Sequence, residues 1–228
     1  MDLVRREFVQ NFTVIRTKFQ TKGRGQIGNC WVSDKDKNLL FSVVLHPTDI
    51  PANNQFILSQ CVALALRDTV ALYCEPVTVK WPNDVYVGSN KIAGILIENL
   101  LVAKNIETSV IGIGLNVNQT AFVGAPNPTS LCLELHRECD SDVVLEQFLT
   151  MFRNYYCSLA DSKEQIRKSY LENLYLVETQ SIFKDKSGEF RGTITSVEED
   201  GRLLIIDEYG DFRRYYFKEV EYLTPKHV

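Results

Sequence analysis

The segment KWPNDVYVGSNKIAGILIE, residues 80–98, sets an ammonium, an amide and carboxylates among short apolar runs. Two such runs flank Gly88-Ser89-Asn90, a pattern typical of a β-hairpin with a tight turn. Strand side chains alternate between faces, so regular alternation predicts one shared face for Lys91, Ala93, Ile95 and Ile97. An ammonium on an apolar face has two explanations. Either its head reaches water at the strand end, or it is held for an anionic substrate.

The corner before this hairpin combines a lysine, an amide and a carboxylate. Pro82 forces Trp81 into an extended conformation and stiffens the approach to Asn83 and Asp84. Such a corner would hold the amide and the carboxylate at fixed angles beside Lys80. An ordinary turn explains Pro-Asn-Asp equally well, so both interpretations stay open.

Residues 23–28, GRGQIG, match the pattern G-x-G-x-x-G, which alone is a weak signal. Dinucleotide binding requires a helix directly after the glycines, but NCWVSDKDKN and then a strand follow. A kinase loop is excluded too, because no His-Arg-Asp or Asp-Phe-Gly follows. What remains is either a mobile turn or a loop that offers backbone N–H groups, Lys22 and Arg24 to an anion.

The segment VIGIGLNVN, residues 110–118, alternates strictly and predicts a strand. One face carries Ile111, Ile113, Leu115 and Val117, and the other carries Gly112, Gly114, Asn116 and Asn118. Neighbouring glycines on one face leave bare backbone, which suits a flat ligand or the close packing of a helix. Asparagine can pair with the donor-and-acceptor edge of adenine. This strand alone does not decide between the two.

Composition bounds the function classes. The 228 residues, 45% apolar and 24% charged, are ordinary for a soluble globular protein with one large and one small domain. Neither a membrane-spanning run nor a secretory leader is present, so we expect a cytoplasmic protein. A net charge of -4 argues against bulk nucleic-acid binding. The six cysteines form no Cys-x-x-Cys pair and the three histidines show no metal spacing, which favours reduced thiols over a zinc site.

These side chains must be positioned by a recognisable set of elements. Strands are expected over residues 12–20 and 38–47, then a largely buried helix capped by Thr48 or Asp49 and ending near Tyr73. Two further helices are expected, from Ser141 to about Ala160 and over residues 163–175. From residue 181 short strands broken by turns predict a small antiparallel barrel. The domains are therefore expected at 1–179 and 180–228.

Three segments in this order resemble the biotin protein ligase (holocarboxylase synthetase) family: GRGQIGNCW (23–31), KWPNDVYVGSNKIAGILIE (80–98) and IGIGLNVN (111–118). The likeness runs from about Phe12 to the barrel-like end of the chain. It implies an α+β fold. A mixed β-sheet flanked by helices, the class II synthetase-like catalytic fold of biotin and lipoate ligases, would precede a small Src-homology-3-like β-barrel.

The resemblance also implies a two-step reaction with ATP, Mg²⁺ and biotin. Biotin's carboxylate attacks the α-phosphate of ATP, releasing pyrophosphate and leaving biotinoyl-adenylate. A lysine amine on a biotin carboxyl carrier domain then attacks the acyl group and AMP departs. Positioning and charge neutralisation supply most of the catalysis in such reactions.

By the same resemblance, particular residues take particular roles. Lys91 would reach between the biotin carboxylate and the α-phosphate, and Arg24 would close the glycine loop over the adenylate. The residues implied for biotin are Gln20, Gly23, Arg24, Lys91 and Gly94. Those implied for ATP or the adenylate are Gly25, Gln26, Gly28, Trp31, Lys80, Asn83, Asp84 and Asn116. Asp84 is also the candidate Mg²⁺ ligand.

Two departures from the family pattern motivate alternatives. Family members usually begin with a strand and a Ser/Thr-Ser/Thr-Asn turn that contacts biotin, whereas this sequence begins MDLVRREFVQ, like the helix after that turn. Gln26-Ile27 also stands where relatives often carry an arginine. The alternatives are a lipoate or octanoate ligase and a catalytically weakened biotin-binding protein. With no room for a helix-turn-helix, no operator binding is expected. A homodimer is left open.

Overall fold

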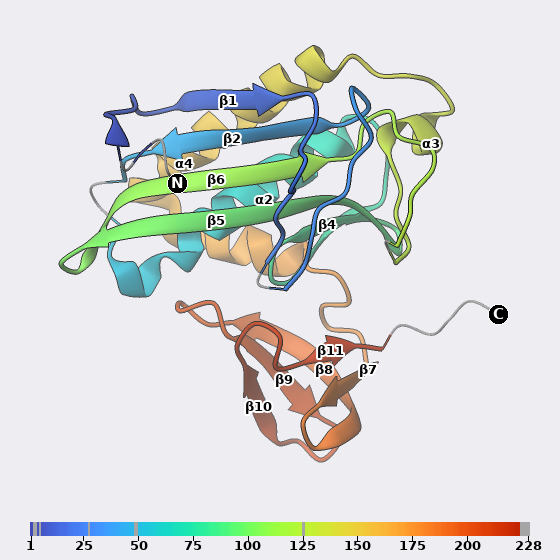
Figure 1. Ribbon diagram of the computed structural model, residues 1–228. Coiled ribbons are helices and arrows are strands. Elements are labelled where there is room, and N and C mark those ends of the chain that lie inside the picture. The colour runs from blue at the N-terminus through green and yellow to red at the C-terminus, as the bar shows by residue number, and fades with distance from the viewer. Residues whose placement is uncertain (2–3, 5, 27, 48–49, 125, 224–228) are drawn as a thin grey trace.

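The computed structural model describes residues 1, 4, 6–26, 28–47, 50–124 and 126–223, which build two β-sheets and a helical layer (Figure 1). The first sheet has six strands in the order β1-β2-β6-β5-β4-β3. Their bounds are Thr13–Thr17 (β1), Leu39–Leu45 (β2), Val77–Lys80 (β3), Asp84–Val87 (β4), Asn90–Val102 (β5) and Asn105–Leu115 (β6). The strands expected at residues 12–20, 38–47 and 110–118 and the hairpin of residues 80–98 are confirmed.

Each ladder of this sheet is antiparallel, from β1–β2 through β2–β6 to β5–β4 and β4–β3. The mixed sheet implied by the resemblance has parallel character only at isolated bridges such as Val79 with Leu174. The reason is that β3, β4, β5 and β6 follow one another through short turns, and a short turn can only join antiparallel neighbours.

The helices cover one face of the sheet, as Figure 1 shows for α2 (Phe56–Ala71) and α4 (Ser141–Glu172). Helix α2 is buried over most of its surface, as its apolar sequence predicts. It starts later than expected, at Phe56 after a 3-10 turn over Ala52–Asn54. The predicted caps Thr48 and Asp49 lie outside the described residues.

The two helices expected at residues 141–160 and 163–175 are confirmed: they meet at a kink at Ser162, which is non-helical, and together form α4, which ends at Glu172. Its N-terminal cap is Asp140, one residue before the predicted Ser141, because the Asp140 carboxylate accepts the N–H of Asp142. A short helix, α3 (Leu131–Leu135), was not expected. Within the described residues no helix has the length and apolarity needed to cross a membrane.

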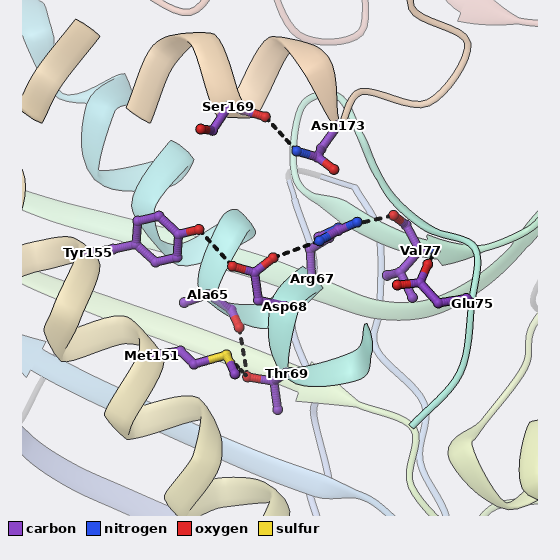
Figure 2. A network of polar contacts seen from close by, with 10 residues as sticks. All are labelled: Ala65, Arg67, Asp68, Thr69, Glu75, Val77, Met151, Tyr155, Ser169 and Asn173. Atoms are coloured by element: carbon purple, nitrogen blue, oxygen red, sulfur yellow. Dashed lines mark hydrogen bonds and ion pairs between the residues drawn. The ribbon is translucent and has the colours of Figure 1, made fainter. Parts of the chain in front are cut away.

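A polar network fixes α2 against its neighbours (Figure 2). The Asp68 carboxylate accepts hydrogen bonds from Tyr155 of α4, at 2.6 Å, and from Arg67, at 2.9 Å. Arg67 also donates to the carbonyl of Val77 at the start of β3, at 3.2 Å. One carboxylate therefore links both helices to the edge of the sheet, and such charge-assisted bonds are among the stronger ones.

The second sheet has five strands in the order β10-β9-β8-β7-β11 (Figure 1). Their bounds are Ser181–Asp185 (β7), Gly188–Val197 (β8), Leu203–Asp207 (β9), Phe212–Tyr215 (β10) and Glu221–Tyr222 (β11). The α+β class is thus confirmed. The Src-homology-3-like closure of this sheet and the domain boundary near Thr179 stay predictions.

The two sheets are joined by contacts at the corner before β4. The Trp81 indole N–H donates to the carbonyl of Gly201 at 2.9 Å, and its ring packs edge-on against Phe217 at 5.3 Å between centroids. Phe217 also contacts Phe56 of α2. Trp81 of the KWPND corner therefore connects the first sheet to the second.

Candidate functional site

A cavity of about 250 Å³ lies on the face of the first sheet opposite the helices, beneath the segment that joins β1 to β2. Its lining combines side chains from that segment with β2, β4, β5 and β6. The predicted site residues among the lining are Gln20, Arg24, Gly25, Gln26, Trp31, Asn83, Asp84, Lys91 and Gly94. Eight of the nine come from the first two resemblance segments, so the fold brings residues far apart in sequence to one place.

A β-bulge brings Lys91 into this cavity. Val85 pairs with Ala93, but the next residue, Tyr86, pairs with Lys91, which leaves Ile92 as an extra residue. The prediction that Lys91 shares a face with Ala93 and Ile95 is therefore wrong. The bulge shifts the alternation by one residue and turns the ammonium to the face of Gly94, away from the helix-facing core.

The Lys91 ammonium forms an ion pair with Asp84 across the β4–β5 ladder. Its Nζ lies 2.7 Å from Asp84 Oδ1, and the two side chains are 29% and 20% exposed. The ammonium also lies 5.7 Å from the centre of the Trp31 ring. Asn83 fastens the corner beside this pair, because its amide donates to the Ile95 carbonyl at 2.7 Å. The cation is half-buried, oriented by a carboxylate and directed into the cavity.

The indole of Trp31 lies on the bare backbone of the glycine strip, which we define as Gly94, Gly112 and Gly114. Gly94 and Gly114 are cross-strand partners. A Cβ added at Gly114 would come within 2.4 Å of the Trp31 ring, and one at Gly94 within 3.0 Å. The indole rather than a helix thus covers Gly94 and Gly114, whereas a Cβ added at Gly112 would meet the Leu96 carbonyl oxygen, at 3.3 Å, and not the indole. The Trp31 ring N–H is buried there without a hydrogen-bond partner among the described residues.

Arg24 reaches across the cavity to the far end of the hairpin strand. It donates two hydrogen bonds to the Glu98 carboxylate, at 3.0 and 2.6 Å. Short backbone bonds shape the loop that carries it, with Gly25 N–H donating to Asn29 O and Trp31 N–H to Gly23 O. Sequence analysis missed Glu98, because a carboxylate at the end of an apolar strand looks like an ordinary solvated strand end.

The two glycines at the ends of the loop pattern do not line the cavity. Gly23 is packed tightly, since a Cβ there would lie 2.2 Å from the Trp31 carbonyl oxygen. Gly28 is exposed and has φ +87°, a left-handed conformation that favours glycine. Ile27 lies outside the described residues. These glycines shape the loop rather than its inner surface.

Lys80 pairs with Asp84 across the β3–β4 ladder but does not line the cavity; its ammonium lies in an aromatic cage. Its Nζ lies 4.9 Å from the ring centres of both Tyr86 and Tyr222 and 5.9 Å from that of Tyr175, and it donates to the Tyr86 hydroxyl at 3.3 Å. Burial lowers the pKa of Lys80, and the nearby Asp84 carboxylate acts in the opposite direction. Because Tyr222 belongs to β11, this cation joins the two sheets.

Asn116 also stays outside the cavity. It follows the end of β6, is buried, and donates through its side-chain amide to the Thr129 carbonyl at 2.9 Å. Asn118 behaves similarly: its amide donates to Cys139 O and accepts from Cys139 N–H. Alternation predicted their face, but the strand ends at Leu115, so both amides hold the following segment in place.

The charges around the cavity are mixed. Its cations are Lys22, Arg24 and Lys91, and its carboxylates are Asp84 and Glu98. Arg24 and Lys91 are each paired with one of these carboxylates. Three cations around a mostly polar, partly glycine-lined surface suit an anionic ligand.

Comparisons with a family model and with known proteins both find protein ligases. Residues 2–116, just over half of the chain, match the model of the biotin/lipoate A/B protein ligase family. The chain is 27% identical to the bifunctional ligase/repressor BirA of Bacillus spizizenii, over 92% of this chain and 66% of that protein, just under two thirds of its length. It is 28% identical to the biotin–[acetyl-CoA-carboxylase] ligase of Paracoccus denitrificans, over 82% of this chain and 80% of that protein.

Solved structures of similar fold include a biotin protein ligase. A biotin protein ligase from Aquifex aeolicus, in complex with biotin and ATP, superposes with a TM-score of 0.79 at 25% sequence identity. The match covers 96% of this chain and 91% of that one. Both sheets of the present chain therefore lie within the compared region.

Proposed function

Since the chain belongs to the biotin/lipoate A/B protein ligase family, we propose that it attaches biotin to a lysine of a biotin carboxyl carrier domain, consuming ATP. The proposal identifies it as an enzyme of the biotin–[acetyl-CoA-carboxylase] ligase type, the name carried by the Paracoccus relative. Biotin and ATP are its substrates, as they are the ligands named for the Aquifex structure. The cytoplasmic location expected from the sequence belongs to the same proposal.

One arrangement carries the proposal: a bulge directs the Lys91 ammonium into a cavity lined by Trp31, whose ring packs on Gly94 and Gly114. In the first step a biotin carboxylate oxygen attacks the α-phosphorus, and the bond to pyrophosphate breaks. Two anions must approach each other for this, and the ammonium between them lowers their repulsion. The charge acts strongly because the side chain is half-buried.

The remaining residues position the reactants. Gly94 and Gly114 let the Trp31 ring lie close to the sheet, where it would offer its buried N–H donor to a ligand. Gln20, at the cavity wall, would contact biotin, and Arg24 would contact the adenylate phosphate. Closing the loop over the mixed anhydride would keep water from it. The acceptor amine then attacks the acyl carbon, and AMP leaves.

Mg²⁺ fits the residues at this place. Asp84 Oδ1 is buried, forms the ion pair with Lys91 and accepts no hydrogen bond from a described residue. Mg²⁺ typically binds one or two carboxylates and completes its shell with phosphate oxygens and water. No group of three or more potential metal-ligating side chains occurs in the described residues, so Asp84 would hold the ion together with the nucleotide. A bound ion would offset phosphate charge.

Biotin-dependent exchange between ATP and labelled pyrophosphate tests the proposal directly, because it requires only the first step. We expect exchange in the wild-type chain and a loss of about a hundred- to a thousandfold in Lys91→Ala, the usual cost of removing one preorganised donor. Lys104→Ala, in the turn between β5 and β6, is the control and should exchange normally.

Wild-type exchange no faster than that of Lys91→Ala would refute the proposal. Replacing biotin by lipoate in the same assay separates the lipoate or octanoate alternative, which the family model by itself does not distinguish. Binding of biotin in calorimetry without exchange would favour the weakened biotin-binding alternative.

A further inference from the structure

We propose that Glu98 is a positioning residue that holds Arg24 in the ligand-free site and is exchanged for a nucleotide phosphate when ATP binds. The inference rests on the proposed function, because ATP is the anion it names. Glu98 would thus act as an internal competitor, and its charge would set how readily the loop releases and recaptures the nucleotide.

The first observation is the geometry of the pair. Arg24 uses both terminal nitrogens, one to each Glu98 oxygen, at 3.0 and 2.6 Å. This is the two-pronged arrangement in which guanidinium also binds phosphate. The same face of Arg24 cannot serve both partners at once, so a phosphate bound in this way has to displace Glu98.

The second observation is the position of the pair in the molecule. Arg24 belongs to the loop above the cavity and Glu98 to β5 in its floor, and both side chains line the cavity. The pair therefore bridges the cavity across 74 residues of sequence. By contrast, Lys22, on the same segment, has no carboxylate within ion-pair distance among the described residues. The loop is tied down through Arg24.

The third observation is exposure, which makes the exchange reversible. The Arg24 side chain is 63% exposed and that of Glu98 is 30% exposed. Ion pairs at such exposed positions contribute little net free energy, because water and salt screen both charges. A multiply charged phosphate can therefore replace the single carboxylate, and the carboxylate can return when the ligand leaves.

ATP binding measured by titration calorimetry at low salt tests the exchange. Glu98→Gln keeps the shape of the side chain but removes the competing charge, so we expect the dissociation constant for ATP to fall about two- to tenfold. Glu107→Gln removes the same charge from an exposed position of β6 and is the matched control, expected to bind ATP like wild type.

A double-mutant cycle separates exchange from a general change in charge. In an Arg24→Ala background, Glu98→Gln should leave ATP affinity unchanged, because no guanidinium remains to be released. Weaker or unchanged ATP binding in the single Glu98→Gln variant would overturn the inference. If the wild-type chain bound no ATP at all, the proposed function would fail as well, so the two failures are distinguishable.

A second readout needs no ligand. Without the Glu98 charge Arg24 loses its ion pair with β5, so trypsin should cleave the Arg24–Gly25 bond faster in Glu98→Gln than in wild type or Glu107→Gln. Mass spectrometry of the first fragments measures this. Equal cleavage rates in all three folded proteins would argue that the pair does not restrain the loop and would contradict the proposal.

Discussion

At the residue scale, the cavity holds its two central cations in pairs with carboxylates, Lys91 with Asp84 and Arg24 with Glu98. The lysine was recognisable from the sequence because an ammonium in an apolar hairpin is unusual. Its orientation was not, because the extra residue Ile92 leaves no trace in the pattern of polar and apolar letters. Pairing across many residues of sequence likewise hid Glu98 from a local analysis.

Lys80 lies outside the cavity. Its place beside Trp81 and Asp84 suggested the nucleotide, and that role stays a prediction. Lys80 pairs with Asp84 across the β3–β4 ladder, and its ammonium lies in a cage of tyrosine rings. One of these rings, Tyr222, belongs to the second sheet, so the cage depends on tertiary contacts rather than on the segment itself.

The contact between Trp31 and the glycine strip can be tested with a single methyl group. Gly114→Ala would place a Cβ within 2.4 Å of the indole, so Trp31 must move into water and its fluorescence emission should shift to longer wavelength. We also expect weaker binding of biotin and ATP, measured by calorimetry.

Gly112→Ala is the matched control on the same strand, because its Cβ would meet nothing closer than 3.3 Å. It should leave the emission nearly unchanged. A Trp31→Phe variant identifies the contribution of this residue, since the chain has only two tryptophans. Equal spectra for the two glycine variants would show that the indole does not rest on Gly114.

At the element scale, strands were predictable and their joins were not. Alternation and turn residues located both sheets, because each strand has one buried face. The break predicted between the helices of residues 141–160 and 163–175 is present as a kink in α4, where Ser162 has a non-helical conformation. The strand β6 ends before Asn116, where buried hydrogen bonds replace the ladder.

The β9–β10 turn of the second sheet is held by one buried carboxylate. Asp207, whose side chain is 1% exposed, accepts the N–H groups of Tyr209 and Asp211 and pairs with Arg213 at 2.8 Å. Burial tends to raise the pKa of Asp207, but these donors and the guanidinium outweigh it and hold the pKa below its usual range. The turn therefore depends on an ionised aspartate.

This shift predicts how stability varies with pH. An acid whose pKa is lowered by folding stabilises the folded state above its unfolded pKa, and the contribution is lost as the pH falls through the folded pKa. We expect Asp207→Asn to be less stable than wild type at neutral pH and to lose less stability below about pH 4. Urea unfolding at several pH values measures both.

Glu208→Gln, at the exposed neighbouring position, is the control and should follow the wild-type pH profile. If Asp207→Asn and wild type lost stability in parallel on acidification, the carboxylate would not be the group responsible.

At the scale of the whole molecule, the second sheet packs on the first through Trp81, Phe217 and Phe56. Gly201 lies at this contact with φ +92° and accepts the Trp81 N–H. The sequence predicted two units from a change in texture near residue 179. It could not predict that Trp81 of the KWPND corner would join these two units.

The tightness of this contact can be measured with two glycines of the same conformation. A Cβ at Gly201 would lie 2.7 Å from the Phe56 ring, whereas one at Gly210, with φ +88°, would meet nothing within 4 Å. We expect Gly201→Ala to lower the free energy of unfolding by about 1–3 kcal/mol more than Gly210→Ala does, since both share the backbone strain. Urea unfolding of both variants gives the difference, and equal losses would mean that the contact is loosely packed.

Within the KWPND corner Trp81 contacts the second sheet, whereas Asn83 and Asp84 line the cavity, and this arrangement limits how far the chain can be shortened. A recombinant fragment cut after Thr179 would retain every residue that lines the cavity, yet it would uncover the Trp81 ring and leave the caged ammonium of Lys80 without Tyr222. Asn83 and Asp84 follow Trp81 directly along the chain and line the cavity. Loss of packing around Trp81 would therefore disturb the cavity as well. The smallest fragment that keeps this site intact is therefore larger than the set of residues that line its cavity.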